Sequence, residues 1–471
     1  MRWAAVLLSW LLRPGARRFR AALADPRAAQ ARVQAQLLAG AQATLYGRDF
    51  RTWDQVPVTD WATMAPWVAR QRAEGGAVLV ADPVRFYERT SGSTGVAKDI
   101  PYTSRLLGAF STLFSIWAED LLASGPRFST GRLYFSVSPR FGGAEAHEAG
   151  TTDDRDFLTG WVGAALRPFW LTVPGLAAAP DATTFWRTLA HALAAERRLE
   201  VISVWSPSFL RVLLDWMVAH RDELPRAALV GDWTRLWPEL KLVSCWASGA
   251  SARGAAQLAA EFPGVLVQGK GLLATEAPVT VPILGVGPVP LLTTTGVELA
   301  VGDRVVGLAD ADVGQEYEVL VSQPAGLLRY RLGDRVRVTG RIAETPLLEL
   351  LGRPSVSDLV GEKLGEGAVE AAIAAVGLPG ARFVALVPAV DHYVLVLDRA
   401  VPGLDGLAAA LDQELQTGFH YRRARALGQL AEVRVVVVPD AAARELAQGP
   451  VWGATKPRLL RTDNQGFEPW T

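Results

Sequence analysis

The feature that most constrains the fold is a strand, helix, strand unit in the middle of the chain. It consists of a buried strand, a loop of small residues, a helix and a second strand, at residues 240–246, 247–251, 252–262 and 265–267. A similar strand, turn and helix precede it, at residues 200–205, 206–208 and 209–220. Strands that alternate with helices in this way form mostly parallel sheets with helices on their faces. The sequence therefore predicts an α/β fold, with ligands bound where the strands end, at the loops 247–251 and 268–278.

The length of the chain predicts two domains. A chain of 471 residues is too long for one ordinary core, and half of its residues are apolar, so burial does not limit folding. We expect a large domain at residues 1–352, in which strands predominate from 291 to 338. The remaining residues, 353–471, alternate helical and extended patterns at 366–376, 383–387, 393–397, 404–416 and 432–438. This order predicts a small α+β domain at the carboxyl end.

The composition excludes partners that are chosen by bulk charge. Lysine plus arginine and aspartate plus glutamate number 48 each, so the chain has no net charge with which to attract nucleic acid or an acidic surface. The single cysteine, Cys245, excludes an internal disulfide framework and fits a reducing compartment, so we expect a cytoplasmic protein. The five histidines are scattered without paired spacing, and no zinc site is expected.

The amino-terminal segment begins with an apolar run at residues 1–12. This run is shorter than the ~20 residues that span a bilayer, and most of the nearby arginines follow it, which is not the order of a signal peptide. We therefore expect an amphipathic helix that packs on the large domain, without stable insertion into a membrane.

A loop rich in hydroxyl groups and glycine ends at a lysine and is a candidate phosphate site. Its glycines allow close approach of the backbone, and its hydroxyls can donate hydrogen bonds to phosphate oxygens. The spacing is not that of a Walker loop, because Ala97 and Asp99 flank the lysine, and a polar surface turn is the alternative interpretation. We expect a strand at 77–80 before the loop and a helix at 104–122 after it, so that a helix start faces the anion. The candidate residues are Thr90, Ser91, Gly92, Ser93, Thr94, Gly95 and Lys98.

Two later segments offer carboxylates near the predicted ligand crevice. Thr275 and Glu276 lie in the loop after a strand, where Glu276 can hold Mg²⁺ beside a polyphosphate, although a helix cap is the alternative. Asp334 follows Gly333 at an expected bend after a strand and can accept hydrogen bonds from ribose hydroxyls. Arg337 can meet a phosphate or an acyl carboxylate, with a salt-bridged hairpin as the alternative. A third group of neighbouring residues, Glu145, His147 and Glu148, is interpreted as a solvated loop rather than a metal site.

Three of these segments occur in the order of a known set of motifs. They are the loop that ends at Lys98, the segment 271–276 and the segment 330–336. Together they resemble the nucleotide motifs of the Gretchen Hagen family, the auxin-responsive acyl-acid amido synthetases, a branch of the adenylate-forming superfamily. The resemblance extends to residues 43–48, 361–363 and 453–458 and covers nearly the full chain. The second motif reads Leu-Leu-Ala-Thr-Glu-Ala and is closer to bacterial relatives than to plant members.

The resemblance assigns roles to the candidate residues. It implies that the residues from Thr90 to Lys98 embrace the phosphates of ATP, that Thr275 and Glu276 lie near the nucleotide and Mg²⁺, and that Asp334 binds the ribose. It also implies that Lys456 is a mobile lysine that approaches the α-phosphate and the acyl carboxylate. The expected catalytic residues are therefore Lys98, Glu276 and Lys456. In such enzymes the small domain turns between two poses, and the hinge is expected at residues 351–354.

The expected function is ATP-dependent activation of a carboxylic acid as an acyl-adenylate, followed by transfer to an amine, expected to be an amino acid. One alternative transfers the acyl group to coenzyme A or a carrier thiol. A second alternative is a protein that binds a nucleotide or acyl group without turnover. The acyl pocket cannot be carried over from the resemblance, so the sequence specifies neither the acid nor the amine, nor the oligomeric state.

Overall fold

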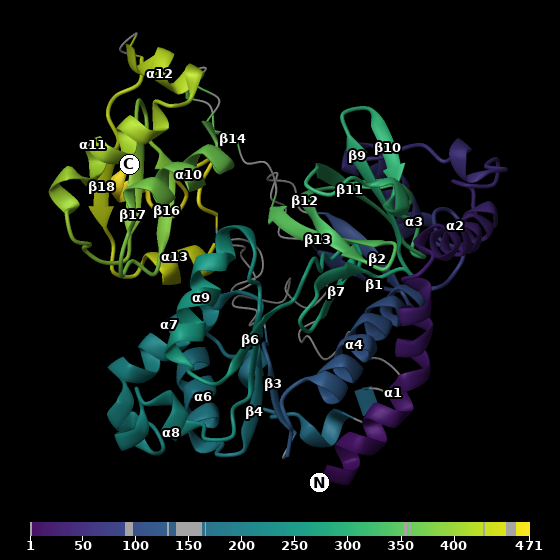
Figure 1. The fold of residues 1–471 in the computed structure, drawn as a ribbon, viewed down its shortest axis with the longest axis horizontal. Coiled ribbons are helices and arrows are strands. Elements are labelled where there is room, and N and C mark those ends of the chain that lie inside the picture. Colours follow the sequence, from purple (N-terminus) through teal and green to yellow (C-terminus); the bar gives the residue numbers. More distant parts are fainter. Residues whose placement is uncertain are drawn as a thin grey trace.

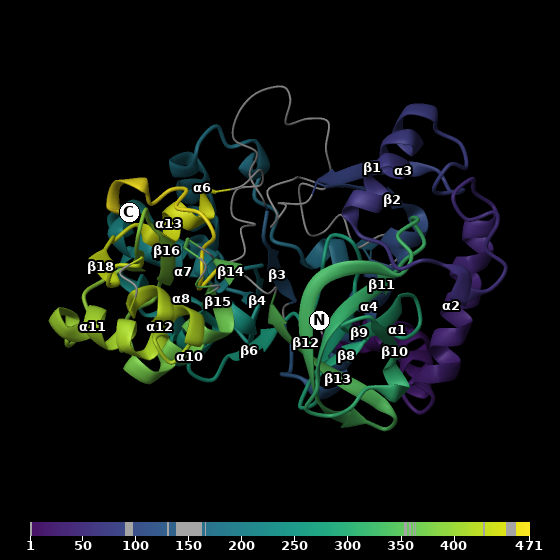
Figure 2. The ribbon, with the colours of Figure 1, turned by 90° about the horizontal axis from the view of Figure 1, so that it is seen from above.

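The computed structural model of the chain describes residues 2–89, 98–129, 131–137, 163–164, 166–352, 356–357, 359–360, 362, 364–426, 429–448 and 458–471. Figure 1 shows three groups of elements: a parallel sheet with its helices, an antiparallel sheet with the amino-terminal helices α2 and α3, and a group formed by the carboxyl-terminal residues. Figure 2 shows the same groups from above, with the carboxyl-terminal group over the helices of the parallel sheet.

The predicted parallel sheet is present, with the strand order β3-β4-β5-β6. Neighbouring strands pair in parallel along the whole sheet, as the alternation of strands and helices requires. The strands are β3 (Arg132–Phe135), β4 (Leu199–Ser203), β5 (Leu242–Cys245) and β6 (Leu266–Gly269). The helices that follow or connect them are α6 (Ala182–Ala195), α7 (Pro207–Ala219), α8 (Trp233–Leu236) and α9 (Ala252–Glu261).

Alternate residues of these strands enter two different cores, because successive side chains of a strand point to opposite faces. Ile202 and Val243 pack with α6, α7 and α9, whereas Val201 and Leu242 pack with α4 (Ser104–Ser124). α4 has the length and hydropathy of a membrane-spanning helix, but 61% of its most apolar window is buried inside the protein. It is therefore a core helix of this fold.

The amino-terminal segment forms α1 (Arg2–Ala22), a helix packed on the large domain as predicted. Leu12 and Phe19 are buried, and Arg20 forms an ion pair with Glu119 of α4. α1 lies beside α4 along most of its length (Figure 1).

A second sheet contains five antiparallel strands in the order β10-β9-β11-β12-β13. The strands are β9 (Gly296–Val301), β10 (Arg304–Gly307), β11 (Glu316–Ser322), β12 (Tyr330–Ile342) and β13 (Thr345–Gly352), and the hairpin of β7 (Thr280–Ile283) and β8 (Gly287–Pro290) precedes them. The helix α2 (Pro26–Gln42) is tied to β9 by the buried side chain of Gln30. Its Nε2 donates to the Thr295 carbonyl at 3.1 Å, and its Oε1 accepts from the Val297 amide at 2.7 Å.

The strand expected at 77–80 is wrong. These residues lie after α3 (Trp61–Glu74) as a buried segment whose amides are satisfied by a side chain, because Gln71 Oε1 accepts hydrogen bonds from Leu79 and Val80. The strand lies further on, as β1 (Val84–Arg89), and it pairs in antiparallel orientation with β2 (Asp99–Thr103).

The residues after Gly352 form an α+β unit, here called the C-terminal unit. Its sheet has the order β16-β17-β18, with β16 antiparallel and β18 parallel to β17. Helix α10 and the hairpin of β16 and β17 confirm the predicted pattern, whereas the helices α12 and α13 were not predicted. The elements are β14 (Val356–Ser357), β15 (Leu364–Gly365), α10 (Glu366–Val376), β16 (Val384–Pro388), β17 (Tyr393–Leu397), α11 (Leu404–Leu415), α12 (Phe419–Ala426), β18 (Arg434–Val437) and α13 (Ala441–Leu446). The division into domains at residue 352 stays a prediction.

Candidate active site

The candidate phosphate loop connects β1 and β2. Arg89 pairs with Asp99, so the loop connects the two strands of a hairpin. The helix expected at 104–122 is present as α4, but β2 lies between the loop and the start of that helix. β2 separates Lys98 from α4, and the side chain of Thr103 caps the start of that helix. Lys98 is described, whereas Thr90, Ser91, Gly92, Ser93, Thr94 and Gly95 lie outside the described residues, as do Lys456, Glu145, His147 and Glu148.

Lys98 is the point at which the three sequence motifs meet. Its Nζ donates to Tyr330 Oη at 2.9 Å and lies 3.3 Å from Glu276 Oε1. Lys98 is 7% exposed and Glu276 is 3% exposed, so the ammonium and the carboxylate are both largely removed from water. A buried charge requires a partner of opposite sign and further hydrogen bonds, and this cluster supplies both.

The loop that carries Glu276 is held in place by Tyr102 of β2. Tyr102 Oη donates to the Thr275 carbonyl at 2.7 Å. Burial raises the pKa of Tyr102 well above 10.0, and the carboxylates of Glu88 and Glu276 add to the effect. The phenol therefore stays protonated and keeps its role as a hydrogen-bond donor at neutral pH.

Asp334 lies inside β12 rather than at a bend after a strand. Glu318 pairs with Arg335 and Leu320 pairs with Arg331, so β12 contains extra residues at this point, which form a β-bulge with Gly333 at φ +82°. Asp334 is buried at 2% exposure, and Tyr330, four residues before it, is buried at 1%. Bulges of this kind redirect a side chain near a site, and they favour glycine where φ is positive.

Arg337 lies on the surface, outside the buried cluster of Lys98, Glu276 and Tyr330. Its guanidinium lies in a largely exposed ion pair with Glu316 of β11, at 2.6 Å, and this pair raises the pKa of Arg337. The structure thus shows the salt-bridged hairpin that was the alternative interpretation, and it does not bring Arg337 to the buried cluster of Lys98, Glu276 and Tyr330.

The described residues contain no group of three or more histidine, cysteine, aspartate or glutamate side chains that could hold a metal. Glu276 is a single carboxylate beside an ammonium. Mg²⁺ that enters a site with a nucleotide needs only one or two protein carboxylates, because phosphates and water supply its other ligands. The residues present therefore fit Mg²⁺ bound with a nucleotide better than a resident metal ion.

A second group of side chains lies at the carboxyl ends of β4, β5 and β6. Lys270 Nζ donates to Ser203 Oγ at 2.7 Å and lies 4.9 Å from the ring centre of Trp205. The rings of Trp205 and Trp246 lie 5.8 Å apart, both half-buried. Lys270 of the predicted loop 268–278 thus meets Trp205 in the segment after β4, whereas a crevice shared with the phosphate loop stays a prediction. Sequence reasoning identified the loops but gave no role to Lys270 or the two tryptophans.

Cys245 lies at the end of β5 beneath this group. Burial raises the pKa of its thiol to about 12, and the nearby charge of Lys270 offsets only part of that increase. The thiol is therefore protonated at neutral pH, and Cys245 is a packing residue rather than a nucleophile.

Solved structures show which fold this chain adopts. The structure titled "AtGH3.15 acyl acid amido synthetase in complex with 2,4-DB" superposes with a TM-score of 0.76, at 19% identity, over 99% of this chain and 95% of that chain. A 2-hydroxyisobutyryl-CoA ligase superposes with a TM-score of 0.58, at 15% identity, over 94% of this chain and 90% of that chain. The fold is that of the adenylate-forming enzymes.

Sequence comparison then places the chain in a family. Residues 15–228 match the GH3 family N-terminal domain and residues 294–353 match the GH3 family central domain, which together span more than half of the chain. The chain belongs to the GH3 family, the Gretchen Hagen family that its motifs resemble.

Curated relatives match over shorter regions. An indole-3-acetic acid-amido synthetase, GH3.3 of Arabidopsis thaliana, is 34% identical over 28% of this chain and 26% of its own length. Another, GH3.8 of Oryza sativa subsp. indica, is 29% identical over 44% of this chain and 41% of its own length. The match with GH3.3 thus spans about a quarter of that relative.

Proposed function

We propose that this protein uses ATP to activate a carboxylic acid as an acyl-adenylate and then transfers the acyl group to an amine, which we propose is an amino acid. The observation that carries this proposal is the buried cluster of Lys98, Glu276 and Tyr330. It joins three segments that are far apart in the sequence and that resemble the nucleotide motifs of the family. The names of the relatives, which are amido synthetases, support the same reaction.

The chemistry explains why a buried cation is needed. In the first step a carboxylate oxygen attacks the α-phosphorus of ATP and pyrophosphate leaves, so negative charge accumulates where two anions meet. Lys98 would offset that charge, and its hydrogen bond to Tyr330 and its ion pair with Glu276 fix the ammonium in advance. In the second step the amine attacks the acyl carbon, loses a proton to solvent and displaces AMP. This step requires positioning and exclusion of water rather than a covalent nucleophile.

Each of the remaining predicted site residues has a role in the proposed reaction. The loop from Thr90 to Gly95 would bind the phosphates, Asp334 the ribose, and Lys456 would approach the α-phosphate when the C-terminal unit turns. Glu276 would provide a carboxylate oxygen for Mg²⁺, which when bound neutralises phosphate charge. We propose a cytoplasmic location, which the single buried thiol of Cys245 supports.

We propose that the acyl acid lies at the carboxyl ends of β4 to β6. The half-buried rings of Trp205 and Trp246 are tilted by 43° to each other and offer apolar ring faces, and the ammonium of Lys270 lies 4.9 Å from the ring centre of Trp205. This arrangement suits an acid whose body is apolar and planar.

The test is an assay of pyrophosphate release by the full chain with ATP, Mg²⁺ and a panel of aromatic and aliphatic carboxylic acids. The proposal expects release that depends on the acid, followed by amide formation when amino acids are added. If pyrophosphate is released and a thioester of coenzyme A forms without any amide, the acyl acceptor is a thiol rather than an amine. Nucleotide binding without release for any acid would contradict an enzyme of this class.

A further inference from the structure

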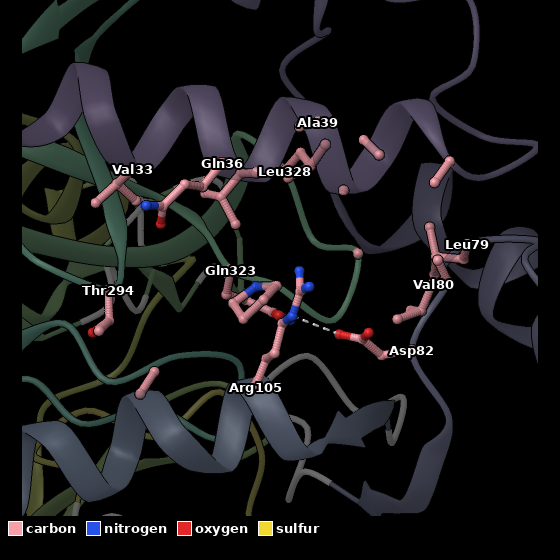
Figure 3. Close-up of a pocket in the computed structure, with 18 of the residues that line it drawn as sticks. Val33, Gln36, Ala39, Leu79, Val80, Asp82, Arg105, Thr294, Gln323 and Leu328 are labelled. Carbon is pink, nitrogen blue, oxygen red and sulfur yellow. Dashed lines mark ion pairs between the residues drawn. The ribbon is translucent and has the colours of Figure 1, made fainter.

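A cavity of about 670 Å³ lies between α2, the start of α4 and three loop segments, at residues 79–82, 293–294 and 323–328, and it is built from residues other than the described candidate site residues (Figure 3). Along α2 the wall contains the apolar side chains of Val33 and Leu37 and one polar side chain, Gln36. Leu79, Val80 and Leu328 line the cavity from the loops. This volume is within the range of sites that enclose a small molecule, which is about 300–1,000 Å³.

The cavity wall also carries polar atoms that have no hydrogen-bond partner among the described residues. They are Gln323 Nε2, the Oγ1 atoms of Thr293 and Thr294, and the phenolic oxygen of Tyr46. Gln323 is fully buried, and its Oε1 accepts a hydrogen bond from the Ala325 amide, which fixes the orientation of the side-chain amide. Buried polar atoms are normally paired, so four such atoms around one cavity indicate a ligand that completes their hydrogen bonds.

A positive charge reaches the same cavity. Arg105 projects from the first turn of α4 toward α2, and its guanidinium lies 3.1 Å from Asp82 (Figure 3). An Arg guanidinium has five N–H donors, more than one carboxylate can accept, so Arg105 can bind a second anion while it keeps its ion pair with Asp82. The donors that line the cavity therefore suit a ligand whose polar end accepts hydrogen bonds.

We propose that this cavity is a second binding site, separate from the nucleotide site, for a small carboxylic acid with an apolar body. The apolar body contacts α2 and the loop residues Leu79, Val80 and Leu328. The carboxylate accepts hydrogen bonds from Arg105, from Gln323 Nε2 and from the threonine hydroxyls.

The first test is titration calorimetry of the full chain with 3-phenylpropanoate in the absence of ATP. Gly40 of α2 lines the cavity, and a Cβ built on it lies 4.0 Å from Arg105, so Gly40→Leu fills the space while it replaces a glycine inside a helix. Gly406→Leu is the matched control, because that glycine of α11 has open space around it. We expect Gly40→Leu to remove one binding event that Gly406→Leu retains. Equal binding by wild type and Gly40→Leu would overturn the proposal.

The second test identifies the chemical class of the ligand. Gln323→Glu keeps the oxygen that faces Ala325 but replaces the donor by a second oxygen, and Arg105→Gln removes the charge. Each variant should weaken 3-phenylpropanoate about tenfold or more, whereas 3-phenylpropanamide should lose little on Arg105→Gln. Equal affinity of wild type for the acid and the amide would overturn the assignment to carboxylic acids. These measurements need no ATP, so their outcome is independent of the pyrophosphate assay.

Discussion

At the scale of single residues, Lys98 and Glu276 have two effects that experiments can separate. The pair is largely buried, so each partner stabilises the other against the cost of burial, and in the proposed reaction the ammonium also offsets phosphate charge. Stability depends on the balance of the two charges, whereas activity depends on the ammonium itself.

We predict that the single variants Lys98→Met and Glu276→Leu are each destabilised by about 3 kcal/mol, because each leaves a buried charge without its partner. The double variant should regain most of that loss, since both charges are gone. Urea unfolding of the four proteins measures the effect, and two single losses that simply add would contradict it.

Pyrophosphate release by the double variant should remain at least about 100-fold below wild type, because the proposed catalytic cation is absent.

We predict that Cys245 does not react with iodoacetamide in the folded protein at pH 8. Its thiol is buried and its pKa is raised to about 12, so very little thiolate is present at that pH. Mass spectrometry should show no adduct under native conditions and a full adduct in urea. Rapid native labelling would show that the end of β5 opens to solvent.

The sequence predicted the types of residue in the site better than the contacts between them. Glu276 and Lys98 were identifiable because their residue types fit a polyphosphate and their motifs have a fixed order. The contact of Lys98 with Tyr330 was not identifiable, because it joins residues that are 232 positions apart through the packing of two sheets. For Arg337 the residue type was not sufficient to predict its partner. An arginine on a strand gives the same sequence signal whether it binds a ligand or pairs with a glutamate on the neighbouring strand.

At the scale of elements, buried strands were predicted well where helices separate them. The expected strand at 77–80 was wrong because a short apolar run is compatible with any buried segment, and here the side chain of Gln71 satisfies the amides that a neighbouring strand would otherwise pair. The hairpin of β1 and β2 was missed for a related reason, because its register depends on a loop rich in glycine and serine rather than on a compact turn signal.

The residues that precede β3 are held in place by one carboxylate of β4, Glu200. The pKa of this carboxylate leads to a prediction about the pH dependence of stability. Glu200 is fully buried and accepts hydrogen bonds from the amides of Ser129 and Gly131, both at 2.6 Å, and from Lys241 Nζ at 2.7 Å. Burial raises the pKa of Glu200, but the hydrogen bonds from Lys241, Ser129 and Gly131 together bring it below 4.5. The stability that Glu200 contributes is therefore fully present above the pKa of an unfolded glutamate and is lost as the pH falls through the lower folded value.

We predict that Glu200→Gln lowers the free energy of unfolding by about 2 kcal/mol at pH 7, because the amide cannot accept from the two backbone amides, the Ser129 hydroxyl and Lys241 at once. The difference between wild type and variant should shrink as the pH falls below the 4.5 of an unfolded glutamate and through the lower folded pKa, because the wild-type carboxylate becomes protonated there. Urea unfolding at a series of pH values measures both effects. A difference that stays constant from pH 7 to pH 3 would contradict the proposed role of the charge.

At the scale of the whole molecule, the C-terminal unit has its own hydrophobic cores and a largely polar contact with the parallel-sheet region. Arg382 Nη1 lies 2.7 Å from Asp215 of α7, and Gln257 of α9 donates to the Ala381 carbonyl at 2.8 Å. The exception is Leu446 of α13, which joins the apolar core around α7. The internal order of the unit was predictable from local periodicity, whereas its position on α7 and α9 depends on these few contacts, which have no local signal.

A contact of this kind suits a unit that changes pose, and Arg382 offers a test of the proposed rotation. Asp215 is half exposed, so the ion pair is worth about 0.2–1 kcal/mol, and its loss should raise the population of other poses by a factor of about one and a half to five. The distance between dyes on Val313→Cys and Val390→Cys reports the pose, because both positions are exposed and Cys245 is too buried to be labelled. Single-molecule energy transfer should show a broader distance distribution for Arg382→Ala. Arg399→Ala breaks an ion pair with Asp398 inside the C-terminal unit and should leave the distribution unchanged. If Arg382→Ala gives the same narrow distribution as wild type, with and without ATP, the C-terminal unit is fixed by the apolar packing of α13 on α7, and Lys456 cannot reach the nucleotide by rotation about residues 351–354.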